Sequence, residues 1–224
     1  MTAFQFSIRD SRDGRNKMRK IIYTVQHTQS EHHVNGYVGA WGNWNLTELG
    51  KEQARRIGKW LCEHENCDGN LKMYSSDLNR ASQTSDEIQK VLGIPDSSVT
   101  KTPLLREINL GEGNGKPRDW YNEHVANPPR VYNPDFRSFP DAESDRELWN
   151  RLYEFYENMI STDDEKILVV SHGGALSFLV SMIIGDRFED TRKRKIFGHS
   201  GAISRFIIQP DDSVEISYLN CQLI

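Results

Sequence analysis

The chain has 224 residues, of which 37% are hydrophobic and 27% charged, and its formal net charge is -4. This composition is typical of a folded globular protein rather than a disordered one, and the charge balance favours neither nucleic acid nor an anionic membrane as a partner. No apolar run approaches the length that a bilayer-spanning helix needs.

Residues 1–19 are rich in arginine and lack the apolar segment of a secretory signal, and Asp10 and Asp13 count against an organelle transit peptide. We interpret this stretch as a flexible N-terminal tail. The cysteines are odd in number and lack CxxC spacing, which favours a reducing compartment, the cytoplasm by default, over a disulfide framework or a zinc cluster. These cysteines are Cys62, Cys67 and Cys221.

The first predicted element is a strand at Ile21–Val25, followed by a helix within residues 45–64. Thr47 is the expected N-cap of this helix. Its expected apolar stripe consists of Leu49, Ala54, Ile57, Trp60 and Leu61. A short strand at residues 71–76 and a helix at residues 80–94, ended by Gly93 and Pro95, come next.

Residues 103–110 are expected to form a short extended piece. The segment from about residue 111 to 142 is rich in glycine, proline and aromatic residues, and a loop this long in a compact domain is usually a functional insertion or lid. An amphipathic helix is predicted at residues 144–160. Residues 166–185 predict a buried strand, a sharp turn and a buried helix, and residues 201–220 a C-terminal hairpin. The alternation of strands and helices favours one three-layer α/β/α domain at residues 20–224 with a mostly parallel sheet.

Two of the predicted strands end in a histidine, His27 and His172. Because parallel strands end along one edge of a sheet, the two side chains are expected to meet there. Arg80, at the start of a helix, and Glu107, after an extended piece, are expected at the same edge. Two histidines, an arginine and a carboxylate at one edge suit an anion site with a proton donor. These are the groups that phosphoryl transfer to a histidine requires.

The chain resembles the histidine phosphatase superfamily, the group that includes the phosphoglycerate mutases. The matching pieces are QHT, WNLTELGKEQARRIG, YSSDLNRASQT, LREINLGEGNG and VVSHGGALSFL, which occur in the family's order over about residues 20–224. The resemblance implies a phosphoglycerate mutase-like fold. It also implies that His27 is the nucleophile, Arg80 a phosphate clamp, Glu107 the general acid and His172 a second histidine that stabilises the transferring group.

The sequence departs from the family pattern beside the nucleophile. Gln26 stands where the family has arginine, Thr28 where it has glycine, and His33 where it often has a phosphate-binding asparagine. These three residues are expected to contact the substrate together with Arg80. Loss of one preorganised donor at a developing charge typically costs about 3 kcal/mol of barrier. Protonated His33, or a basic residue of the 187–195 stretch, could restore part of the charge.

The expected function is hydrolysis of a small phosphorylated metabolite through a phosphohistidine on His27, with no metal and no cofactor. Inorganic phosphate or the substrate is the expected partner. Three alternatives stay open: a phospho-ligand-binding pseudo-enzyme, a phosphoglycerate mutase-type phosphotransferase, and a metal-dependent hydrolase built on His27, His32, His33 and His172. Candidate specificity residues in the 111–142 segment are Arg118, Trp120, Tyr121, Arg130 and Arg137.

Overall fold

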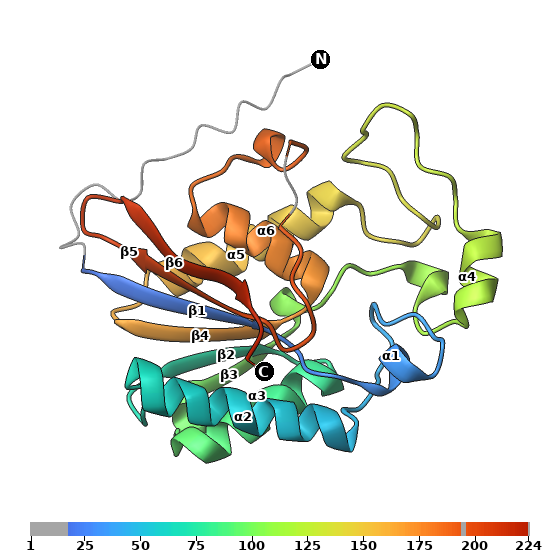
Figure 1. Ribbon diagram of the computed structural model, residues 1–224. Coiled ribbons are helices and arrows are strands. Elements are labelled where there is room, and N and C mark those ends of the chain that lie inside the picture. Colours follow the sequence, from blue (N-terminus) through green and yellow to red (C-terminus); the bar gives the residue numbers. More distant parts are fainter. Residues whose placement is uncertain (1–17, 194–195, 224) are drawn as a thin grey trace.

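The computed structural model describes residues 18–193 and 196–223. In these residues, six strands form one sheet in the order β3-β2-β4-β1-β5-β6 (Figure 1). The strands are β1 Lys20–Gln26, β2 Lys72–Ser76, β3 Val99–Thr102, β4 Lys166–Ser171, β5 Ile203–Ile208 and β6 Val214–Cys221. The helices are α1 Glu31–Val34, α2 Glu48–Glu65, α3 Asn79–Leu92, α4 Arg118–His124, α5 Asp145–Ile160 and α6 Gly173–Ile183.

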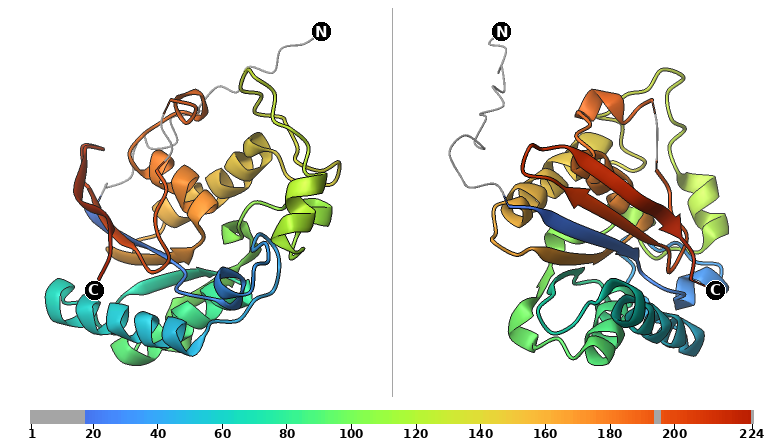
Figure 2. Two further views of the ribbon diagram at one scale, coloured as in Figure 1. Left: turned by 45° about the vertical axis from the view of Figure 1, so that its right-hand side comes forward. Right: turned by 60° about the vertical axis from the view of Figure 1, so that its left-hand side comes forward.

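The sheet is mostly parallel, as predicted. Strands β3, β2, β4 and β1 run parallel to one another, whereas β5 lies antiparallel to β1, and β6 antiparallel to β5. The last two strands are the predicted C-terminal hairpin. Helices α2 and α3 cover one face of the sheet, and α5 and α6 cover the other, so the three-layer α/β/α prediction is confirmed (Figures 1 and 2).

Strand β4 shows why the central strands are apolar without alternation. Leu168 and Val170 pack with the core under α2 and α3, while Ile167 and Val169 pack with the core under α5 and α6. Because helices cover both faces of the sheet, the side chains on both sides of β4 are buried, and apolar residues need not alternate with polar ones. This buried strand holds the candidate site in place at its carboxyl end.

The predicted cap of α2 is confirmed, because the Thr47 hydroxyl oxygen accepts the Gly50 N–H at 3.0 Å. The prediction that Leu49 faces inward is wrong, since it is 52% exposed. Gly50 is buried in its place, and a Cβ there would lie 1.9 Å from the Gln29 carbonyl oxygen. The helix thus packs its glycine against the loop after β1, which turns Leu49 outward.

The prediction of an extended piece at residues 103–110 is wrong for residues 103–105. The strand, β3, ends at Thr102, and Pro103–Leu105 forms a 3-10 turn in which Thr102 Oγ1 accepts the Leu104 N–H at 3.2 Å. The predicted insertion contains α4, which lies next to α1 beyond the carboxyl end of β1 (Figures 1 and 2). Residues 1–17 of the predicted tail lie outside the described residues. Within the described part of the chain, no helix combines the length and the apolar character that crossing a membrane requires.

Candidate active site

The candidate site lies where the parallel strands β1 and β4 end side by side. Gln26 pairs with Ser171 in their register, and the His27 N–H donates to the Ser171 carbonyl oxygen at 2.8 Å. The residues that follow the two strands, His27 and His172, therefore lie next to each other, with 5.1 Å between their ring centroids. The structure brings together the two histidines that the sequence places at this edge.

His27 is 3% exposed, and each of its ring nitrogens has a partner. Nδ1 lies 2.9 Å from the Thr28 carbonyl oxygen, which can only accept, so Nδ1 carries the proton. Nε2 is then unprotonated and accepts a hydrogen bond from Arg80 Nε at 3.1 Å. Burial, assisted by the charge of Arg80, holds the pKa of His27 well below its usual range. The imidazole is therefore neutral near pH 7, with Nε2 as its nucleophilic atom.

Arg80, the second residue of α3, is 1% exposed. Its Nη1 donates to the Gly42 carbonyl oxygen at 2.8 Å and its Nη2 to that of Ala40 at 2.7 Å. With Nε on His27, these bonds among the described residues use three of the five guanidinium N–H groups and leave two for an anion. Burial lowers the pKa of Arg80 to about 10, so the side chain remains a fixed cation near pH 7.

His172 is fully buried at the start of α6. Its Nε2 lies 2.8 Å from Ser76 Oγ, and that hydroxyl oxygen accepts the Leu78 N–H at 3.3 Å. Among the described residues Nε2 is the one acceptor bonded to this buried hydroxyl, so the Ser76 hydroxyl donates to Nε2 and the proton of His172 lies on Nδ1. Among the described residues this Nδ1 has no partner. Burial, with the charge of Arg80, holds the pKa of His172 well below its usual range, so this buried ring next to His27 is neutral and carries an unpaired N–H donor.

Glu107 accepts three backbone N–H groups, two of them from the first turn of α6 and one from the residue that follows Glu107. Oε1 accepts from Ile108 at 2.9 Å and Ala175 at 3.0 Å, and Oε2 accepts from Gly174 at 2.9 Å. A Cβ on Gly174 would lie 2.5 Å from Oε1, so the glycine makes room for the carboxylate. Oε2, with a single N–H partner, is the oxygen with room for a proton.

Gln26 ends β1 with its amide in the cavity wall. Its Oε1 is buried without a hydrogen-bond partner in the described part of the chain. A Cβ built on Gly173 or on Gly198 would lie 3.3 or 3.2 Å from this oxygen, so two glycines frame the amide. The position where the family resemblance expects a guanidinium thus holds a neutral amide, which can donate to an anion or accept from a ligand.

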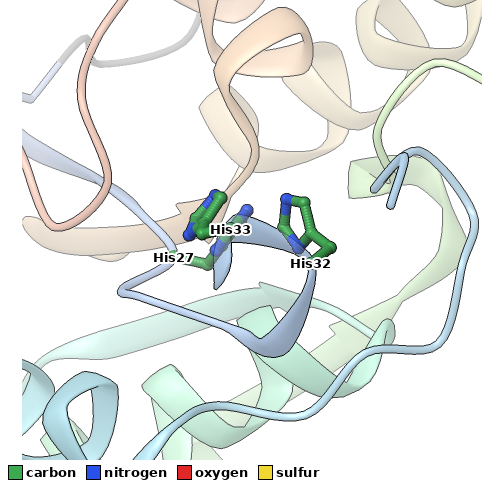
Figure 3. Close-up of side chains that lie close together, drawn as sticks. All are labelled: His27, His32 and His33. Atoms are coloured by element: carbon green, nitrogen blue, oxygen red, sulfur yellow. The ribbon is translucent and has the colours of Figure 1, made fainter. Parts of the chain in front are cut away.

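Helix α1 places His32 and His33 beside His27, as Figure 3 shows. His33 Nδ1 accepts the Ser30 N–H at 3.2 Å, so its proton lies on Nε2. His32 Nδ1 lies 2.7 Å from Ser30 Oγ. Burial, followed by His33, lowers the pKa of His32 to about 3, and burial, followed by Arg80, lowers the pKa of His33. Both rings are therefore neutral near pH 7, and His33 does not restore the charge that Gln26 lacks.

His27, His32 and His33 form a cluster of the kind that a metal site would need. One nitrogen each of His27, His32 and His33 can be chosen so that all three lie within 4.8 Å of one another. A metal needs lone pairs that converge at about 2.0–2.1 Å. The Nε2 lone pair of His27 accepts a hydrogen bond from the Arg80 cation, and the Nδ1 lone pair of His33 accepts one from a backbone N–H. This donor set suits an anion better than a cation.

These groups line a cavity of about 620 Å³. Its walls include Gln26, His27, His32, His33, Arg80 and Glu107, and Arg118 lies at its exposed rim. Thr28, predicted to contact the substrate, is fully buried with Oγ1 3.2 Å from Thr84 Oγ1, outside the lining. His172 is also outside the lining, and its ring lies next to that of His27.

Arg118 is the one predicted specificity residue that lines the cavity. Trp120 stacks on His124 of α4 at 4.2 Å between ring centroids, and Arg137 pairs with Glu147 of α5, so both have partners away from the cavity. Tyr121 and Arg130 also lie outside the lining, as do the described basic residues of the 187–195 stretch.

Two side chains that the sequence did not single out for the site hold the backbone of Glu107. Trp41 Nε1 donates to the Glu107 carbonyl oxygen at 2.7 Å, and Arg151 Nη2 donates to it at 3.2 Å. Arg151 Nη1 also donates to the carbonyl oxygens of Leu104 at 2.8 Å and Arg106 at 3.0 Å. A clamp on backbone oxygens leaves no sequence signature, because every residue offers one.

Comparison with known proteins identifies the family and the fold of this chain. The model of the histidine phosphatase superfamily (branch 1) matches residues 22–221. A 2,3-bisphosphoglycerate-dependent phosphoglycerate mutase of Bartonella bacilliformis is 29% identical over 179 residues, 75% of this chain and 83% of its own. A candidate phosphoserine phosphatase of Hydrogenobacter thermophilus is 30% identical, over 76% of this chain and 82% of its own. The alpha-ribazole phosphatase from Shigella flexneri has the same fold, with a TM-score of 0.73 at 24% identity, over 91% of this chain and 98% of that one.

Proposed function

We propose that this chain, which belongs to the histidine phosphatase superfamily, hydrolyses small phosphate monoesters through a phosphohistidine on His27, without a metal ion. The observation that carries the proposal is the fixed tautomer of His27, with its unprotonated Nε2 beside Arg80 and beside the unpaired Nδ1–H of His172. A nucleophile and two donors for phosphoryl oxygens thus meet in one buried place.

In the first step, His27 Nε2 attacks phosphorus, and the new N–P bond forms as the P–O bond to the alcohol breaks. Arg80 turns its Nε–H from His27 to a phosphoryl oxygen, which frees the lone pair that attacks. His172 Nδ1–H and the Gln26 amide hold further oxygens. Glu107 delivers a proton from Oε2 to the departing alcohol oxygen.

In the second step, water attacks the phosphohistidine and gives its proton to the Glu107 carboxylate. The N–P bond breaks, inorganic phosphate leaves, and His27 and protonated Glu107 are restored. The Nδ1–H bond to the Thr28 carbonyl oxygen keeps the ring in one orientation throughout the cycle.

Hydrolysis is favoured over mutase chemistry by the charge of the cavity. A mutase must hold a phosphoenzyme and rebind a substrate that carries further anionic groups. The described lining supplies two guanidinium groups, Arg80 inside and Arg118 at the rim, and its histidines are neutral near pH 7. A substrate with one phosphate suits this balance better than a bisphosphate.

The test is to trap the phosphoenzyme. The protein is mixed briefly with 4-nitrophenyl phosphate in EDTA, and the acid-labile phosphoryl group is located by mass spectrometry. We expect it on His27 in the wild type and in His199→Asn, an exposed-histidine control, and not in His27→Asn. Turnover that persists in His27→Asn, or that EDTA abolishes, would refute the mechanism. An inert wild type would favour the pseudo-enzyme.

A further inference from the structure

We infer that the alcohol part of the substrate is a compact apolar group, a branched alkyl chain or a single aromatic ring, bound in a second cavity beside Glu107. The inference rests on the proposed function, because it takes Glu107 as the donor to the leaving oxygen. The second cavity measures about 70 Å³ and lies between α5, α6 and the residues that precede β5.

The two cavities share two lining residues that contact Glu107. Ile108 and Gly174 line both of them, and the backbone N–H groups of these two residues donate to the Glu107 carboxylate at 2.9 Å each. In the inferred arrangement, the ester oxygen that Glu107 protonates sits beside these two shared residues. With phosphorus held at His27, the carbon on the other side of that oxygen points into the second cavity.

The walls of the second cavity are apolar. Leu148 comes from α5 and Phe178 from α6, while Phe197, before β5, forms the outer wall and is 63% exposed. The described lining residues include no charged side chain, so none of them would hold a carboxylate or a second phosphate.

The two hydroxyl groups in the lining are already bonded to backbone. Ser177 Oγ accepts the Ile196 N–H at 3.2 Å, and Thr191 Oγ1 donates to the Phe188 carbonyl oxygen at 2.6 Å. The Ser177 hydroxyl keeps its proton and the Thr191 hydroxyl keeps its lone pairs for a ligand. The other five described lining residues offer apolar side chains or none, so most of the wall suits a methyl or ring carbon and favours an apolar alcohol.

Binding of non-hydrolysable phosphonates tests the inference without catalysis. Methylphosphonate, isobutylphosphonate and 2-carboxyethylphosphonate share the anionic head and differ in the part that would enter the second cavity. By calorimetry, we expect the isobutyl compound to bind roughly tenfold or more tightly than the methyl compound. The carboxyethyl compound should gain nothing over the methyl one. Phe197→Ala should remove most of the isobutyl preference and leave methylphosphonate binding unchanged.

Equal affinity for the methyl and isobutyl compounds, tighter binding of the carboxyethyl compound, or no binding of any of them overturns the inference. Hydrolysis of 4-nitrophenyl phosphate by the same preparation reports on the proposed function separately. An isobutyl preference without turnover would refute the hydrolase and leave the cavity assignment standing. Turnover without the isobutyl preference would refute the cavity assignment and leave the proposed hydrolase standing.

Discussion

Arg80 Nε donates to His27 Nε2 at 3.1 Å, so the buried guanidinium of the site lies directly against the proposed nucleophile. This contact places a cation where the phosphoryl oxygens will lie, and it also helps to keep His27 neutral. The neighbouring position that would supply a second guanidinium holds Gln26. The electrostatic stabilisation of the proposed transition state therefore depends on Arg80 and on neutral N–H donors.

Gln26→Arg should raise the rate of aryl phosphate hydrolysis. A fixed guanidinium at the end of β1 adds two charge-assisted N–H donors for phosphoryl oxygens, and the expected gain in kcat/KM is roughly tenfold to a hundredfold. Gln26→Met, which fills similar space without donors, is the matched control and should lose activity. A Gln26→Arg variant no faster than wild type would mean that the amide does not face the transferring group.

Much of the fold follows from the sequence because its strongest signals are local. The apolar run of β4 requires cover on both faces, and Thr47 caps its helix through neighbouring residues. The meeting of His27 and His172 follows from the general rule that parallel strands end at one edge. Leu49 was misplaced because its exposure is set by a distant contact, the approach of Gly50 to the Gln29 carbonyl oxygen.

The chemistry of the site is less predictable than its position. The tautomer of His33 depends on the Ser30 backbone N–H, which reaches it only once α1 has formed. The tautomer of His172 depends on Ser76, which lies at the end of another strand. Both fix where a proton sits, and neither contact can be read from residue type or spacing.

Phosphate should bind more tightly as the pH falls from 7 towards 5, because of His33. Burial lowers the pKa of His33, so the ring is neutral near pH 7 and gains its charge only on acidification. A bound anion favours the charged form of the ring, so protonation of His33 and phosphate binding strengthen each other. Competitive inhibition by inorganic phosphate, measured for wild type and His33→Asn, isolates this effect from the titration of phosphate itself. Parallel pH profiles for the two proteins would exclude His33 from the anion site.

Ser76→Ala should slow turnover through His172. The Ser76 hydroxyl donates to Nε2 and so keeps the His172 proton on Nδ1, which has no partner among the described residues. Loss of one such hydrogen bond is worth about 1 kcal/mol, so we expect kcat to fall roughly fivefold to tenfold. Ser75→Ala is the matched control, because Ser75 is equally buried and its hydroxyl donates to the Ser76 carbonyl oxygen at 2.9 Å. A similar loss of kcat in both variants would indicate a packing effect.

The adjacent glycines at the start of α6 should differ sharply when each is replaced by alanine. In Gly174→Ala the new Cβ would lie 2.5 Å from Glu107 Oε1, so the carboxylate must shift from the position in which it accepts its three N–H groups. In Gly173→Ala the nearest atom is Gln26 Oε1 at 3.3 Å, which a small side-chain shift accommodates.

Because alanine suits a helix better than glycine, neither change should weaken α6 itself, and the difference between the two variants reports on Glu107. We expect kcat of Gly174→Ala to fall roughly a hundredfold, within the usual contribution of a positioned acid–base group, and that of Gly173→Ala to change less than threefold. The two kcat values, measured together with the thermal unfolding midpoints of both variants, test whether Glu107 is the proton donor. Equal kcat in both variants at equal stability would mean that Glu107 is not the proton donor, and the assignment of the leaving-group side of the cavity would fall with it.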